Sequence, residues 1–149
     1  MKEITHVLFN TAVIYYLVLY LFHYTDILIL IFITFCAAIL NAAIDRLGHE
    51  NDGLAIRRSK LIHSIEALII MPLLFIGYSF YINTATLIVL VTLLNLPLHA
   101  LLDLLNKDGL YSLIFEKQIR IADFRFNDIL INSLLITISV IILYLAFIS

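Results

Sequence analysis

Charged side chains are scarce in this sequence. Asp, Glu, Lys and Arg make up 13% of its 149 residues and hydrophobic residues make up 63%, whereas soluble domains carry about 25% charged and about 45–50% apolar residues. A chain with so little polar surface cannot cover itself in water, which excludes an ordinary soluble domain. Its length fits one domain, so we expect residues 1–149 to form a single transmembrane helical domain.

Cysteine is nearly absent from the sequence, and long runs of basic residues are absent. Cys36 is the only cysteine, so no intramolecular disulfide can form. No run of Lys and Arg of the kind that binds a phosphate backbone occurs, and no nucleic-acid partner is expected. The first apolar segment has no small-residue cleavage site before Tyr24, so we expect it to stay in the protein as a helix rather than to be removed as a signal peptide.

Five long apolar segments fill most of the sequence. Each approaches the ~20 residues that an α-helix needs to cross the hydrocarbon core of a bilayer. They are Val7–Tyr24, Ile27–Ile44, Leu61–Ile82, Thr84–Leu105 and Ile129–Ile148. We therefore expect an all-α, multi-pass bundle of about five transmembrane helices in the cell membrane.

All nine Lys and Arg residues lie at one end of these segments. They occur at the N-terminus, in the loop after the second segment and in the region after the fourth. The connections around Thr25 and Asn83 and the C-terminal tail carry none. Because Lys and Arg in short loops are retained on the cytoplasmic side, we expect the N-terminus inside and the C-terminus outside.

The last cytoplasmic loop, Lys107–Asn127, alternates polar and apolar residues over 117–121 and 123–126. This alternation predicts two short strands, or a β-ribbon that lies against the membrane surface. Gly48 and Gly109 follow the second and fourth segments. Both are expected to end their helices in the left-handed conformation.

Side chains of the metal-ligand type gather at the cytoplasmic ends of four segments. Two of those segments end in Asp and His four residues apart, which share one helix face. The six candidate ligands are His6, Asp45, His49, His63, His99 and Asp103. Imidazole and carboxylate together suit a divalent metal, Zn²⁺ first and Mn²⁺ or Fe²⁺ as alternatives. Six exceed the ligands of one catalytic zinc, so either two metals bind or some of the six support the others.

Several of these polar residues have competing interpretations. Asp45 and Glu66 are candidates for a catalytic base, although Glu66 can equally pair with Arg57 or Arg58. The two arginines carry the fork that binds the phosphate of a substrate, yet the cytoplasmic bias of basic residues explains them without one. A single histidine at a helix end can also cap the helix or bond to a neighbouring helix, which is the simpler explanation for any one of them taken alone.

At these residues the chain resembles a family of membrane-bound metal-dependent hydrolases that includes the LexA-binding inner-membrane proteins and small archaeal members. The matching stretches are Thr5-His6, Ile44 through His49, Arg58 through Ser64, and His99 through Asp103 followed by Asn106 and Gly109. Two positions depart from the family's pattern: Ile62 stands where Thr usually precedes His, and Asn106 where Thr often follows Asp.

The resemblance implies hydrolysis by a metal-activated water. The substrate is then a small molecule or a membrane lipid, and a phosphoester or lipid headgroup suits a site at membrane depth. A second hypothesis is transport of a metal ion or proton, because imidazoles and carboxylates within spans also build relays. A third is a non-catalytic scaffold whose polar cluster holds helices together. The sequence favours no particular oligomeric state.

Overall fold

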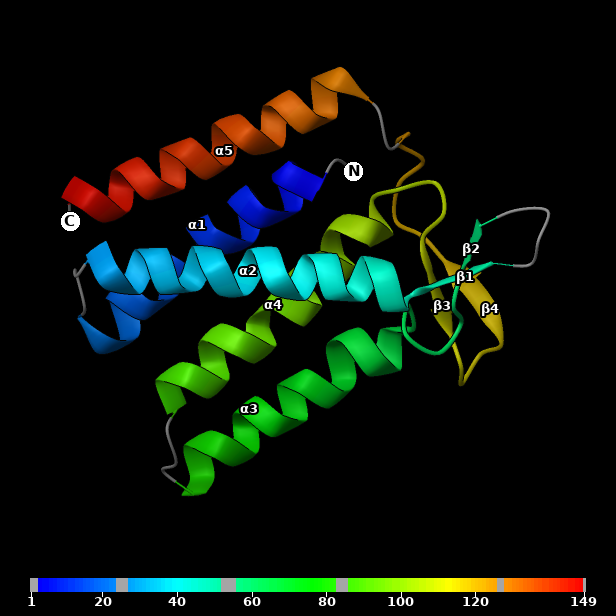
Figure 1. Cartoon of the computed structure of the whole chain (residues 1–149), viewed down its shortest axis with the longest axis horizontal. Coiled ribbons are helices and arrows are strands. Elements are labelled where there is room, and N and C mark those ends of the chain that lie inside the picture. Colours follow the sequence, from blue (N-terminus) through cyan, green and yellow to red (C-terminus); the bar gives the residue numbers. More distant parts are fainter. Residues whose placement is uncertain (1–2, 24–26, 52–55, 83–85, 126–127, 149) are drawn as a thin grey trace.

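The chain folds mostly into helices (Figure 1). A computed structural model describes residues 3–23, 27–51, 56–82, 86–125 and 128–148, with the backbone alone at 49–51, 56–58, 79–82 and 86–88. The helices are α1 (Glu3–Phe22), α2 (Ile27–Leu47), α3 (Met71–Ile82), α4 (Thr86–Leu104) and α5 (Ile129–Ile148), and one π-helical segment, η1 (Glu66–Ile70), leads into α3. The predicted helical class is confirmed.

Three of the described helices, α1, α2 and α5, are long and apolar enough to cross a membrane. Shorter apolar helical stretches cover Glu66–Tyr78 and Val89–Leu104. The predicted third segment, Leu61–Ile82, becomes helical only from Ile65 because residues 60–63 form turns. A fold that can associate with a membrane is therefore confirmed, and the number of spans and their direction stay predictions.

The interior of the bundle holds many polar side chains beside apolar clusters, and its outer faces are apolar. Buried polar side chains include Thr5, His6, Asn10, Asn41, Asn95, His99, Asp103 and Asn132. Large apolar side chains lie exposed on the outer faces, among them Leu28, Phe35, Leu74, Leu130 and Phe147. Lipid accepts exposed Leu and Phe but penalises polar groups, so this distribution suits a hydrocarbon surrounding.

Hydrogen bonds between side chains join the helices through this polar interior. The Thr5 hydroxyl donates to Asn132 Oδ1 at 2.7 Å and links α1 to α5. Asn10 Nδ2 donates to the backbone oxygen of Asn95 at 3.2 Å and to its Oδ1 at 3.3 Å, which links α1 to α4. Such bonds between membrane helices contribute on average about 0.6 kcal/mol each, so they fix the register of the helices more than they stabilise them.

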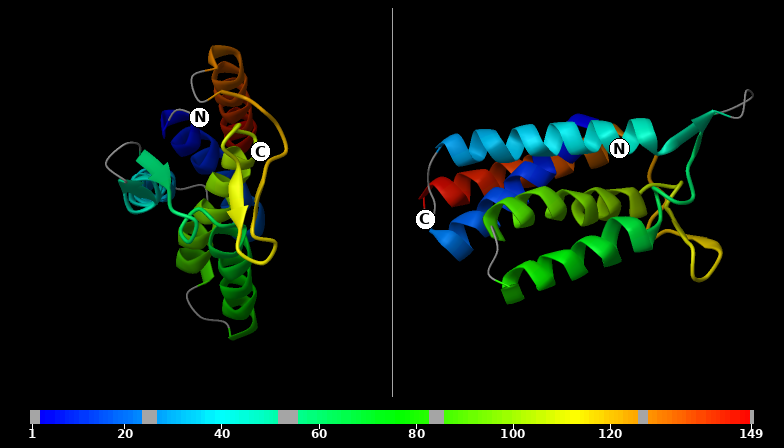
Figure 2. Two further views of the ribbon diagram at one scale, coloured as in Figure 1. Left: turned by 90° about the vertical axis from the view of Figure 1, so that its right-hand side faces the viewer. Right: turned by 60° about the horizontal axis from the view of Figure 1, so that its bottom comes forward.

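Helix α4 lies in the middle of the bundle and contacts α1, α2 and α3, while α5 packs on α1 (Figures 1 and 2). The start of α1, the ends of α2 and α4 and the start of η1 lie at one end of the molecule, beside both β-hairpins. The basic residues whose side chains are described all belong to this end: Arg46, Lys60, Lys107, Lys117, Arg120 and Arg125. We call it the loop end.

Two short hairpins cover the loop end. In the first, β1 (His49–Asn51) pairs antiparallel with β2 (Ile56–Arg58). In the second, β3 (Leu110–Ser112) pairs antiparallel with β4 (Lys117–Ile119). The ribbon predicted in the last loop is present, but the described residues 123–125 form no strand beyond an isolated bridge between Phe124 and Asn106, and Phe126 lies outside the described residues. The partner of β4 is β3, because contacts of the 112–114 segment with Glu66, distant in sequence, hold that strand in place.

The two glycines after the helices behave differently from each other. Gly109 has a φ of +56°, as predicted, but it turns the chain into β3 and lies well after α4 has ended at Leu104. Gly48 follows α2 directly, yet its φ lies outside the left-handed region, so the prediction of a left-handed cap there was wrong. Gly48 is needed for a different reason: its missing side chain leaves room for His63.

Candidate metal centre

Four of the chain's elements meet at the loop end and bring five of the six candidate ligands there. His6 lies in the first turns of α1, Asp45 in the last turn of α2, His63 in the turn before η1, and His99 and Asp103 one turn apart at the end of α4. The four residues other than Asp45 are buried. The side chain of Asp45 keeps 40% of its surface exposed, so this carboxylate is the side of the cluster open to solvent.

Three ligand atoms lie close enough to hold one metal ion. Asp45, His63 and His99 each offer an atom within 4.8 Å of the other two. His99 Nε2 is 3.9 Å from Asp45 Oδ1. In a tetrahedral zinc site with bonds of about 2.0–2.1 Å, ligand atoms lie about 3.4 Å apart, so shifts of about 1 Å would complete the coordination.

The orientation of His99 suits a metal ligand. Its Nδ1 lies 2.6 Å from Asn41 Oδ1, and because a carbonyl oxygen can only accept, Nδ1 carries the proton. In the neutral ring Nε2 then has the lone pair, and it faces Asp45 and, at 3.4 Å, Asp103 Oδ2. Nε2 has no hydrogen-bond partner among the described residues. A lone pair facing two carboxylates is repulsive unless a cation lies between them, and ligating histidines usually have this kind of supporting bond at the other nitrogen.

Asp103 lies between two imidazoles. Its Oδ2 faces His99, and its Oδ1 lies 4.0 Å from His6 Nε2. The rings of His6 and His99 are tilted by 37° with centroids 4.5 Å apart, and the centroid of the His63 ring lies 6.2 Å from that of His99. A buried carboxylate needs a compensating positive charge, which a protonated imidazole or a metal ion can supply here.

Backbone contacts hold His63 beside α2. Its amide donates to the Ser59 carbonyl at 3.1 Å, and its carbonyl accepts from the Tyr111 amide at 3.1 Å. The Ser59 amide in turn donates to the Gly48 carbonyl at 2.6 Å. A methyl group added at Gly48 would overlap the His63 imidazole and would lie 2.5 Å from the Ile44 carbonyl oxygen. The position of this ligand therefore depends on a glycine distant from it in sequence.

Glu66 serves the last loop rather than the ligand cluster. Its carboxylate accepts from the Ser112 hydroxyl at 2.8 Å and from the amides of Leu113 and Ile114 at 3.0 and 3.2 Å. These donors, the Leu113 amide first, lower the pKa of Glu66 to about 2. A carboxylate with so low a pKa is a weak base, and it clamps the β3–β4 turn onto η1.

Replacing Glu66 by Gln is expected to loosen this turn. Hydrogen bonds to a charged acceptor are the stronger kind, so the Leu113 and Ile114 amides should exchange hydrogen on the order of tenfold faster. In the wild type the pKa of Glu66 is lowered, so protection should persist from pH 7 to about pH 4 and decline as the pH falls towards 2. Hydrogen exchange read by mass spectrometry measures both effects. Glu116→Gln, the same change at an exposed residue of the same turn, should leave exchange unaltered; equal effects of the two variants would contradict the clamp.

The remaining predicted site residues lie in the first hairpin. His49 is in β1 and stands opposite Arg58 of β2, next to Arg57. Their side chains lie outside the described part of the structure. His49 as a ligand and the two arginines as substrate-binding residues stay predictions.

Asn41 and Gly48 belong to the site but were not among the predicted site residues. Asn41 lies one turn before Asp45 on α2, and this spacing of four was the available signal. Nothing local to Gly48 indicates its contact with His63.

Ile62 and Asn106 are the two positions at which the chain departs from the pattern of the family it resembles. Ile62 lines an apolar pocket. Asn106 is buried with no hydrogen-bond partner for its side chain among the described residues.

Comparison of the chain with protein-family models, with curated proteins and with solved structures gave no match. The resemblance to membrane-bound hydrolases therefore stays a prediction. The fold and the cluster define a class: a helical protein with helices able to span a membrane and a His/His/Asp group that could hold a metal ion.

Proposed function

We propose that this protein is a membrane-embedded, metal-dependent hydrolase that acts on a phosphoester at the cytoplasmic end of a five-helix bundle. One observation carries the proposal: Asp45, His63 and His99 come from three separate elements, and their ligand atoms lie within 4.8 Å of one another. His99 Nε2 faces two carboxylates, an arrangement that a metal ion between them would make favourable.

The topology we propose has all five helices crossing the membrane, with the N-terminus inside. The described basic residues gather at the loop end, which supports a cytoplasmic location for that end. The polar interior and apolar exterior support a lipid surrounding. Glu66 and both hairpins then lie outside the hydrocarbon, at the cytoplasmic interface.

In this proposal Asp45, His63 and His99 hold a divalent ion, and the mixture of nitrogen and oxygen ligands favours zinc. When bound, such an ion supplies a Lewis acid that makes water nucleophilic near neutral pH. Asn41 keeps the proton of His99 on Nδ1, and Asp103 orients His99 and His6.

The residues around the ligands can move the protons that hydrolysis requires. The water oxygen forms a bond to phosphorus, and the bond between phosphorus and the alcohol oxygen breaks. Asp45, through the carboxylate oxygen that does not hold the ion, would accept the water proton, and a proton on His6, beside Asp103, would pass to the leaving alcohol. Proton exchange with solvent then restores both groups, so the net reaction consumes one phosphoester and one water.

The arrangement of the core favours hydrolysis over transport. A transporter needs polar groups that continue to the far side of the membrane. Beyond Asn10 and Asn95 the described interior is closed by an apolar cluster that includes Ile14, Tyr15, Val18, Ile33, Leu90 and Val91. The polar groups of the ligand cluster thus gather at one end of the described bundle rather than along a path through it.

Hydrolysis of p-nitrophenyl phosphate by the purified protein tests this proposal. We expect activity that a chelator abolishes and that one equivalent of Zn²⁺ restores, because the ion supplies the nucleophile. Asp45→Asn should lower turnover by about 100-fold or more, because it removes both a ligand of the ion and the general base. The exposed Asp123→Asn serves as the matched control. Activity that survives complete removal of metal would contradict the proposal.

A further inference from the structure

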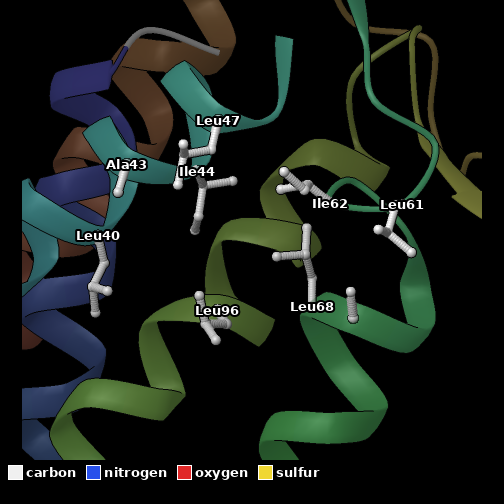
Figure 3. Close-up of a pocket in the computed structure, with 9 residues that line it drawn as sticks. Leu40, Ala43, Ile44, Leu47, Leu61, Ile62, Leu68 and Leu96 are labelled. Atoms are coloured by element: carbon white, nitrogen blue, oxygen red, sulfur yellow. The ribbon is translucent and has the colours of Figure 1, made fainter. Parts of the chain in front are cut away.

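An apolar pocket opens beside the ligand cluster, between α2 and η1 (Figure 3). Helices α2 and α3 both pack on α4 but hardly touch each other. A gap therefore remains between them, over the surface of α4. The pocket has a volume of about 310 Å³, and its lining consists of Leu, Ile and Ala residues. This volume is at the lower end of the range of small-molecule sites, about 300–1,000 Å³.

Each wall of the pocket carries a lining residue close in sequence to one of the three ligands. On α2, Ile44 lines the pocket and precedes Asp45. In the loop before η1, Ile62 lines it and precedes His63. On α4, Leu96 lines it and lies one turn before His99. The pocket and the ligand cluster are therefore built on the same three segments of the chain: the end of α2, the turn before η1 and the second half of α4.

Two exposed leucines line the pocket, and each follows a basic residue in the sequence. Leu47 and Leu61 keep 70% and 66% of their surface exposed. The residues before them, Arg46 and Lys60, are exposed cations, and the Lys60 ammonium lies 5.1 Å from the centre of the Tyr111 ring. Exposed leucines suit hydrocarbon, and the two cations suit the phosphate of a lipid headgroup, whose negative charge complements them.

We propose that this pocket holds one acyl chain of an anionic phospholipid from the surrounding bilayer, with the phosphate between Arg46, Lys60 and the ligand cluster. This names the substrate class of the function proposed above and rests on that function for the reaction, although not for the binding. The reaction on phosphatidic acid takes up water, breaks the bond between phosphorus and the glycerol oxygen, and yields inorganic phosphate and diacylglycerol.

The headgroup, rather than the chain, decides which lipid binds. A chain that moves from the bilayer into an apolar pocket exchanges one hydrocarbon surrounding for another, so it contributes little to the choice among lipids and acts by positioning the phosphate. Selectivity must then come from the contacts of the phosphate with the two cations. Phosphatidic acid, which has no positive group on its headgroup, should bind better than phosphatidylcholine.

Photolabelling tests the pocket directly. The full-length protein is placed in phosphatidylcholine nanodiscs that contain a trace of phosphatidic acid with a diazirine on one acyl chain, and the labelled residues are mapped by mass spectrometry. We expect adducts concentrated on pocket residues such as Leu40 and Leu96. Leu96→Trp fills the pocket and should lower this labelling at least about fivefold, whereas Leu74→Trp, an equal change on the exposed face of α3, should not. Ala43→Phe fills the pocket from α2 and provides a second variant if Leu96→Trp fails to fold.

The turnover of two substrates separates this inference from the proposed function. Filling the pocket should lower phosphate release from phosphatidic acid about tenfold and leave that from p-nitrophenyl phosphate unchanged. Labelling spread evenly over the lipid-facing helices, or unaffected by filling, would overturn the inference even where metal-dependent hydrolysis of the nitrophenyl ester stands. Labelling specific to the pocket in a protein that binds no metal would uphold the lipid site and overturn the hydrolase.

Discussion

His99→Asn is expected to abolish stoichiometric metal binding by the purified protein. His99 faces both Asp45 and Asp103, at 3.9 and 3.4 Å from its Nε2, and asparagine offers no imidazole nitrogen in that place. We expect the affinity for Zn²⁺ to fall by more than about 100-fold, since loss of a supporting residue alone typically costs 10–100-fold. Competition with a fluorescent zinc chelator measures the affinity.

Two further variants should show a smaller loss of zinc affinity and no loss. Asn41→Leu removes the bond at His99 Nδ1 and should weaken zinc binding by about 10–100-fold, the range for residues that orient a ligand. His23→Asn makes the same substitution as His99→Asn at an exposed histidine that follows α1, away from the loop end, and should leave zinc affinity unchanged. If His99→Asn and His23→Asn bound zinc equally well, the assignment of His99 would fail.

Gly48→Ala is expected to displace His63 and to weaken both metal binding and the fold. The added methyl group overlaps the His63 imidazole and crowds the Ile44 carbonyl oxygen at 2.5 Å. Overpacking of this kind costs about 1–3 kcal/mol, so the midpoint of thermal unfolding should fall by several degrees. Zinc affinity should fall by about tenfold or more, because a ligand displaced by about 1 Å no longer reaches the ion.

Gly77→Ala is the matched control for this change. Nothing lies within 4 Å of the position that its Cβ would occupy, and alanine favours the helix by up to about 1 kcal/mol. This variant should therefore unfold at the same or a higher temperature and bind zinc normally. Adding His63→Ala to Gly48→Ala should remove part of the stability loss, since the two residues then no longer collide. A Gly48→Ala protein with unchanged unfolding and unchanged zinc affinity would contradict the contact.

The helical fold could be predicted because the interior of a lipid bilayer allows few backbone structures. Apolar segments such as Ile27–Ile44 must satisfy their backbone groups internally, and the structure has α2 there with small differences at the ends. The partner of β4 could not be predicted in this way. It depends on Glu66, which holds residues 112–114 through hydrogen bonds across more than 45 positions of sequence.

At the candidate site, too, contacts set by local spacing could be predicted, and contacts between residues distant in sequence could not. The spacing of four between His99 and Asp103 predicts a shared helix face, and the two side chains do meet. The approach of His63 to α2 depends on how the 59–63 turn folds back, which no local pattern reveals. The general rule for glycine after a helix predicted a left-handed cap at Gly48; a tertiary contact with His63 explains that glycine instead.

Zinc K-edge X-ray absorption on the purified, zinc-loaded protein tests the metal centre most directly. We predict one zinc per chain with two imidazole nitrogens at about 2.0–2.1 Å and carboxylate oxygen at about 2.0–2.2 Å, from His63, His99 and Asp45. A spectrum of water oxygens alone, or a protein that retains no stoichiometric zinc, would contradict the proposal that these three residues form a metal site.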